Sequence, residues 1–82
     1  MIKALDMNDY EAYDTMIEAL HEQGVTDESI KNKIADTYRD QYKDAYRSGN
    51  WVRMAEIEQI LDNTGYSFNV LNWEKAVAKE ND

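Results

Sequence analysis

The sequence contains no cysteine and no proline, and it has only three glycines. Without cysteine the chain has no disulfide framework, no thiolate nucleophile and no cysteine-based zinc site. The amino-terminal stretch MIKALDMNDYE holds no sustained apolar run, which excludes a signal peptide and a membrane span there. These absences predict a cytosolic setting, or a particle that is assembled in the cytosol.

Basic residues are also scarce, and their distribution is uneven. The 82 residues carry a net charge of −8, which argues against direct binding of nucleic acid, because phosphate contacts need lysine and arginine. Residues 4–30 contain no lysine or arginine but hold eight acidic residues: Asp6, Asp9, Glu11, Asp14, Glu18, Glu22, Asp27 and Glu28. The other acids and bases balance, so the whole net charge belongs to the first third of the chain.

The strongest positive signal is a repeated pattern of helix ends and starts. The stretches GVTDESI (24–30) and GYSFNVL (65–71) both combine a helix-ending glycine, an apolar residue and a hydroxyl residue that can cap the next helix. Val25 with Ile30, and Tyr66 with Leu71, have the spacing of hydrophobic staples. The expected N-caps are Asn8 (with Glu11 completing a capping box), Thr26, Asn50 and Ser67.

These signals predict an all-α protein with a single helical domain over residues 1–82. Its four short helices are expected at about 8–23, 27–47, 51–63 and 68–79. We expect them to form two consecutive helical hairpins in a small bundle. The broad apolar stripes on the first three helices favour a closed bundle, because an open arrangement exposes much aromatic surface.

Catalytic and metal-binding patterns are weak, so the sequence predicts no enzyme, no cofactor and no metal site. Glu18 and His21 have the Glu-x-x-His spacing of di-iron bundles, but those bundles need the motif on two helices, and this chain has one histidine. None of the three serines has a histidine at a suggestive position for nucleophilic catalysis. The ordinary explanation is that His21 lies at the solvent edge of an acidic helix.

Two surfaces are candidates for binding a partner. The first is an aromatic face, since nine aromatic residues are more than a small bundle covers easily, and tyrosine and tryptophan are enriched at protein interfaces. We assign Tyr42, Tyr46, Trp51 and Trp73 to this face. The alternative is that these rings are partly buried and that only the tyrosine hydroxyl groups reach water.

The second candidate surface is an acidic face on the first predicted helix. Glu11, Asp14, Glu18 and Glu22 share one side of that helix, opposite its tyrosines and isoleucine. In one interpretation these carboxylates bind a basic protein surface by mimicking the phosphate spacing of DNA. In the other they form a solvated face that keeps the domain soluble.

The stretch YKDAYRSGNWVRMAEIEQILDNTGYSFNVLNW (42–73) resembles a helical segment of uncharacterised bacteriophage and prophage proteins of gut bacteria. The residues that carry the resemblance are Tyr42, Tyr46, Gly49, Asn50, Met54, Ile57, Leu61, Thr64, Gly65 and Trp73. The resemblance implies that the protein is encoded by a phage, and that it acts in particle structure or in contact with host proteins. It implies a location in the host cell cytoplasm or the virion.

Two functional hypotheses follow. The leading one is a non-catalytic, phage-associated helical module that binds another protein of phage or host, in particle assembly or as part of a larger phage protein. Self-association is a variant of this hypothesis. The alternative is an acidic, nucleic-acid-mimicking inhibitor of a host nucleic-acid-binding protein, of the anti-CRISPR or anti-restriction type. Neither hypothesis includes direct binding to nucleic acid or to a membrane.

Overall fold

The computed structural model of the chain describes residues 1–80, which form five α-helices and no β-strand. They are α1 (Ile2–Asp6), α2 (Tyr10–Glu22), α3 (Asp27–Ser48), α4 (Trp51–Asn63) and α5 (Val70–Glu80). The predicted all-α class is therefore confirmed over the described residues. Four of these helices correspond to the predicted ones, whereas the short helix α1 was not predicted. The last two residues of the predicted domain lie outside the described part of the chain.

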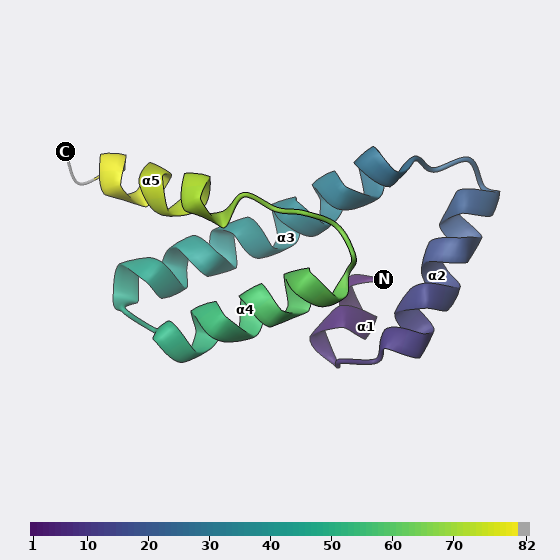
Figure 1. The fold of residues 1–82 in the computed structure, drawn as a ribbon, viewed down its shortest axis with the longest axis horizontal. Helices are drawn as coiled ribbons and strands as arrows, with labels where there is room; N and C mark the ends of the chain where they lie inside the picture. The colour runs from purple at the N-terminus through teal and green to yellow at the C-terminus, as the bar shows by residue number, and fades with distance from the viewer. Residues whose placement is uncertain (81–82) are drawn as a thin grey trace.

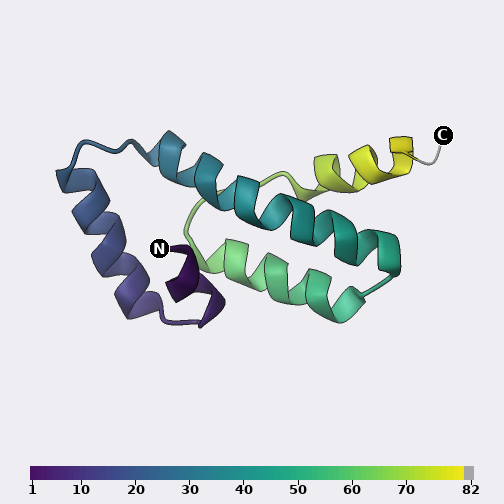
Figure 2. The same ribbon diagram turned by 180° about the vertical axis from the view of Figure 1, so that it is seen from behind.

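Helix α3 is the centre of the arrangement (Figures 1 and 2). Helix α4 packs against it in the antiparallel direction, and α5 packs against it in the parallel direction. Helix α2 packs on α1, and the two lie near the end where α3 begins. The molecule is elongated, with principal extents of 45 × 22 × 16 Å.

The helices pack together around one core, but their pairing corrects the prediction of two consecutive hairpins. The closest pairs are α3 with α4 and α3 with α5, while α2 diverges from α3 (Figure 1). The residues between α4 and α5 explain why these two helices do not form the second predicted hairpin. Residues 64–69 form an extended linker that leads back along α3, so that α5 packs on α3 instead of returning along α4.

One hydrophobic core runs from α1 to α4. Its fully buried members include Leu5 of α1, Ile57 of α4 and a row on α3 at four-residue spacing, Ile30, Ile34, Tyr38 and Tyr42. The hydroxyl groups of the three tyrosines buried in this core, Tyr13, Tyr38 and Tyr42, have hydrogen-bond partners. The hydroxyl of Tyr38 donates a hydrogen bond of 2.5 Å to the Asp6 carboxylate, which fastens α1 to α3.

Three helix ends have the same hydrogen-bond pattern. After α2, the N–H groups of Gly24 and Val25 donate to the carbonyl oxygens of His21 and Leu20, with Gly24 in the left-handed region at φ +85°. This is the Schellman motif, and it recurs at Gly49 after α3. The predicted ends at both glycines are confirmed.

The third Schellman motif corrects the prediction for Asn8. This residue has a φ of +58°, its N–H donates to the Leu5 carbonyl, and the N–H of Asp9 donates to the Ala4 carbonyl. Asn8 therefore ends α1 instead of capping α2. The N-cap of α2 is Asp9, whose carboxylate accepts a hydrogen bond from the N–H of Ala12.

The remaining caps are partly as predicted. The side chains of Thr26 and Asn50 accept hydrogen bonds from backbone N–H groups three residues on, which confirms them as the caps of α3 and α4. Ser67 does not cap α5, because the helix begins later and the Asn69 side chain accepts from the N–H of Asn72 instead. For the same reason the Tyr66–Leu71 staple does not form, and Leu71 is 61% exposed.

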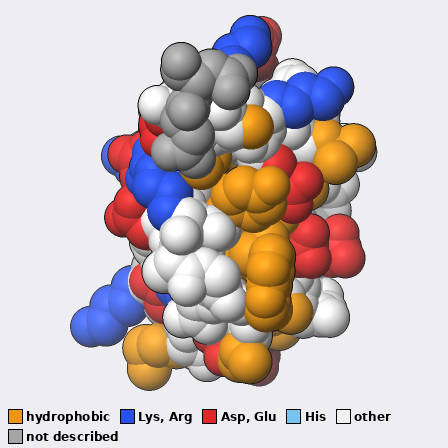
Figure 3. Space-filling view, turned by 90° about the vertical axis from the view of Figure 1, so that its left-hand side faces the viewer, with side chains coloured by type: hydrophobic (Ala, Val, Ile, Leu, Met, Phe, Trp, Pro, Cys, Tyr) orange, Lys and Arg blue, Asp and Glu red, His pale blue; other side chains and the backbone are white. Residues whose placement is uncertain are grey.

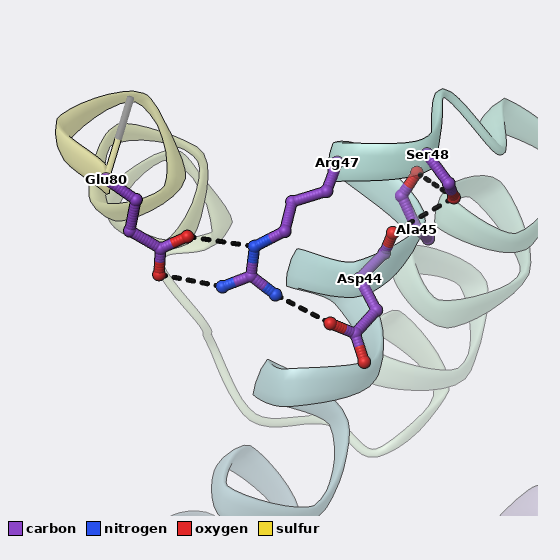
Figure 4. A network of polar contacts seen from close by, with 5 residues as sticks. All are labelled: Asp44, Ala45, Arg47, Ser48 and Glu80. Atoms are coloured by element: carbon purple, nitrogen blue, oxygen red, sulfur yellow. Dashed lines mark hydrogen bonds and ion pairs between the residues drawn. The ribbon is translucent and has the colours of Figure 1, made fainter. Parts of the chain in front are cut away.

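An arginine fork fixes the end of α5 to the end of α3 (Figure 4). The guanidinium of Arg47 donates two hydrogen bonds, of 2.9 and 2.7 Å, to the two carboxylate oxygens of Glu80. A third, of 2.6 Å, goes to Asp44 on α3 itself. These contacts, with the Glu80 carboxylate first, raise the pKa of Arg47, and the Arg47 guanidinium lowers the pKa of Glu80. The parallel packing of α3 and α5 is what brings the two residues together.

Candidate functional site

The structure separates the four residues of the predicted aromatic face. Tyr42 is fully buried, so its assignment to a partner-binding surface is wrong. It lies where α3, α4 and α5 meet, and its hydroxyl donates to Glu74 at 2.7 Å and, over a longer distance of 3.4 Å, to Glu58. Burial, together with these hydrogen bonds, raises the pKa of Tyr42. Trp73 is half-buried, edge-on to the Tyr42 ring at a centroid distance of 5.7 Å.

Trp51 is the member of this set that faces solvent. It is 65% exposed at the first position of α4, and its neighbour Val52 is 72% exposed. The half-buried ring of Tyr46 meets Trp51 edge-on, with the centroids 6.3 Å apart and the ring planes at 89°. We name Tyr46, Trp51 and Val52 the end patch, because they flank the turn between α3 and α4.

The end patch lies at one end of the long axis of the molecule. Figure 3 looks onto that end and shows a continuous hydrophobic strip, with acidic and basic side chains on its flanks. Exposed tryptophan beside an aliphatic side chain is unusual for a surface that only faces water, whereas tryptophan and tyrosine are enriched in the buried centres of protein interfaces. This end can therefore bury apolar area against another protein.

The predicted acidic face is present on the outer side of α2. All four of its residues are exposed, and none takes part in an ion pair within residues 1–80: Glu11, Asp14, Glu18 and Glu22. Because α2 packs mainly on α1 and stands away from α3, its outer side is open to solvent (Figure 1). The face can attract a basic partner, and it can equally remain solvated.

His21 does not pair with Glu18. Its Nε2 lies 2.6 Å from the Asp27 carboxylate, and the Tyr66 hydroxyl donates to the same carboxylate oxygen at 2.9 Å. The contacts with His21 and Tyr66 lower the pKa of Asp27, while burial and the Asp27 carboxylate raise the pKa of Tyr66 to about 12. This cluster ties the end of α2, the start of α3 and the linker together, which is a structural role.

Neither a metal cluster nor a membrane-spanning helix is present in residues 1–80. No three histidine, cysteine or acidic side chains are grouped so that they hold a metal ion. None of the five helices is both long and apolar enough to cross a lipid bilayer.

The structure contains several surface cavities that were not predicted. An apolar groove of about 500 Å³ lies between α2 and α3, and its lining includes Met16, Leu20, Val25 and Ile30. A second, more polar pocket of about 370 Å³ lies between α4 and the linker. The sequence shows little sign of either, because the first depends on the angle between the consecutive helices α2 and α3, and the second on the path of the linker after α4.

Comparisons with known protein families, with curated proteins and with solved structures return no match. The functional argument therefore rests on the surfaces themselves.

Proposed function

We propose that the protein is a non-catalytic helical module that binds another protein through the end patch. The observation that carries the proposal is the exposure of Trp51 and Val52 beside Tyr46 at the turn between α3 and α4. In line with the resemblance over residues 42–73, we propose a phage origin and a partner from the phage particle, a larger phage protein or the host. A second copy of the chain is a further candidate partner.

Three features support this surface over other parts of the molecule. Tryptophan is the residue type most often found among the few that dominate an interface. The edge-on contact with Tyr46 holds the Trp51 ring in place, so that binding orders little additional side chain. The eight acidic residues that account for the net charge all lie in residues 4–30. They are outside the end patch, so they do not oppose an apolar contact there.

The test is affinity capture from a lysate of phage-infected cells, using the wild-type protein, Trp51→Ala and Met7→Ala. Met7 is the matched control, because it is also a large apolar side chain, 67% exposed, but lies at the turn between α1 and α2. If Trp51 is central to the interface, its truncation costs about 2 kcal/mol or more of binding free energy, roughly a thirtyfold loss of affinity.

The expected result is a partner that is retained in high salt by the wild type and by Met7→Ala, and is lost with Trp51→Ala. Sedimentation of the purified protein tests for self-association. If a second copy of the chain is the partner, Trp51→Ala shifts a dimer to a monomer. Equal retention by Trp51→Ala and Met7→Ala would contradict the proposal.

The acidic face supports a second candidate function, an inhibitor that occupies the nucleic-acid channel of a host protein, of the anti-CRISPR or anti-restriction type. The specific observation is that four exposed carboxylates on α2 lack ion-pair partners within the described residues. Such a contact is screened by salt, because the Debye length falls from about 10 Å at 0.1 M to about 3 Å at 1 M.

The second candidate is tested by neutralising Glu18 and Glu22 to glutamine. The matched control neutralises Asp36 and Asp40 to asparagine, which removes the same charge from the exposed side of α3. Inhibition of a host nuclease or recognition complex that is lost in the α2 variant, kept in the α3 variant and weakened by salt supports this function. Equal inhibition by both variants would refute it.

A further inference from the structure

The pocket between α4 and the linker has a lining that differs from the rest of the surface. Two carboxylates on α4, Glu58 and Asp62, lie one helical turn apart, and two aromatic rings of the linker, Tyr66 and Phe68, complete the lining. Leu61, which is buried, and Val70 supply apolar surface, and Ser67 adds a hydroxyl. With a volume of about 370 Å³, the pocket falls at the lower end of the range of about 300 to 1,000 Å³ that is typical of ligand sites.

We propose that this pocket binds the guanidinium group of an arginine side chain from a partner. Carboxylates accept the forked hydrogen bonds of a guanidinium, and aromatic rings stack on its planar face. The combination of both groups in one concave site satisfies the charge and the flat shape of the same ligand. The site is separate from the end patch and from the acidic face of α2, and it does not depend on the function proposed for either.

The two carboxylates are available for such a ligand. The side chain of Asp62 is exposed and makes no hydrogen bond or ion pair within the described residues. Glu58 uses one oxygen, Oε1, in the long contact of 3.4 Å from the Tyr42 hydroxyl, and Tyr42 has a closer partner in Glu74. Binding an arginine therefore does not require that a strong contact of the fold is broken.

The aromatic side of the pocket already interacts with a cation. The Nζ atom of Lys31 lies 5.9 Å from the centroid of the Phe68 ring, a distance at which cation–π attraction operates. The positive charge of Lys31 also disfavours a second cation nearby. We therefore assign the attraction for the ligand mainly to Glu58 and Asp62, and the selection of its shape to the rings.

The experiment is a titration of the ¹⁵N-labelled protein, followed by NMR, with N-acetyl-arginine amide. The matched ligand is N-acetyl-citrulline amide, which has nearly the same shape but no charge. N-acetyl-lysine amide tests whether the planar group is needed. The expected result is saturable shifts of the amide signals around Glu58, Asp62 and Phe68, with arginine binding at least tenfold more tightly than citrulline and severalfold more tightly than lysine.

Two variants locate the binding on the protein. Asp62→Asn should weaken arginine binding at least threefold, whereas Asp40→Asn, which removes the same charge from an exposed position on α3, should leave it unchanged. Equal affinities for arginine and citrulline, or equal affinities for arginine and lysine, would overturn the assignment of a guanidinium site. An Asp62→Asn protein that binds like Asp40→Asn would overturn the location.

Discussion

Replacing Tyr42 by alanine tests whether this residue has a structural role. Trp51, which is close to it in the sequence but lies at the surface, is the comparison. Tyr42 is fully buried where three helices meet, and Trp73 packs on its ring from α5. Its hydroxyl also bridges α3 to Glu74 of α5 at 2.7 Å. Trp51, nine residues later, is 65% exposed, and its ring meets that of Tyr46 edge-on.

The expected losses in the free energy of unfolding differ severalfold between Tyr42→Ala and Trp51→Ala. Truncation of a buried large aromatic residue to alanine costs about 3 to 5 kcal/mol, from lost apolar transfer and the cavity that remains. Loss of the hydrogen bond to Glu74 adds about 1.5 kcal/mol, the low end for a charged partner, because Glu74 is half-buried and regains water when the hydroxyl is removed. Truncation of the exposed Trp51 ring should cost less than about 1 kcal/mol, chiefly its contact with Tyr46.

A chain of this size has a stability of roughly 4 to 12 kcal/mol, at about 0.05 to 0.15 kcal/mol per residue. Tyr42→Ala should therefore remove a large part of the free energy of unfolding. The assay is urea denaturation followed by far-UV circular dichroism, with Tyr42→Phe to isolate the hydroxyl group and Trp51→Ala as the surface comparison. If Tyr42→Ala costs no more than Trp51→Ala, the packing described here for α3, α4 and α5 is refuted.

Three further predictions concern a cap, the tyrosines and the α5 contact. Asp9→Ala should lower the free energy of unfolding by about 1 kcal/mol in urea titrations, and Asn8→Asp, which cannot restore that cap, should not compensate in the double variant. Burial raises the pKa values of Tyr38 and Tyr42 in the folded protein. Their contribution to the free energy of unfolding is therefore complete below about pH 10, the ordinary tyrosine pKa, and is lost as the pH rises further. An absorbance titration of tyrosinate beside circular dichroism should show unfolding above that pH; full ionisation without unfolding would contradict it. Arg47→Gln should speed amide exchange in the last turn of α5, measured by NMR, while the urea midpoint hardly moves.

Local signals predicted the helix boundaries well where one residue type has one role. Gly24 and Gly49 end helices because they adopt the left-handed conformation without steric cost, and Thr26 caps α3 through its own side chain. Asn8 is different, because asparagine favours both N-caps and left-handed helix ends. The sequence alone does not decide between these roles. Because Asn8 was assigned as an N-cap, α1 was not among the predicted helices.

The candidate site was predicted less well, since burial of each ring depends on contacts that are distant in sequence. Tyr42 continues a four-residue spacing that includes Ile34 and Tyr38, and that periodicity was a usable sign of burial. The exposure of Trp51 has no such sign, because it depends on α5 packing beside α3 and leaving the start of α4 uncovered (Figures 1 and 2). Apolar character alone did not distinguish the two residues.

The shape of the molecule keeps its two candidate surfaces independent. The acidic face lies on α2, and the end patch lies at the turn between α3 and α4, at opposite ends of a molecule 45 Å long (Figure 1). The Debye length at physiological ionic strength is about 8 Å, so the carboxylates of α2 exert little force on a partner bound at the end patch. Substitutions at the two ends should therefore have additive effects on stability. Salt should discriminate between the two functions, because a contact made by the carboxylates of α2 weakens more steeply with rising ionic strength than an apolar contact at the end patch.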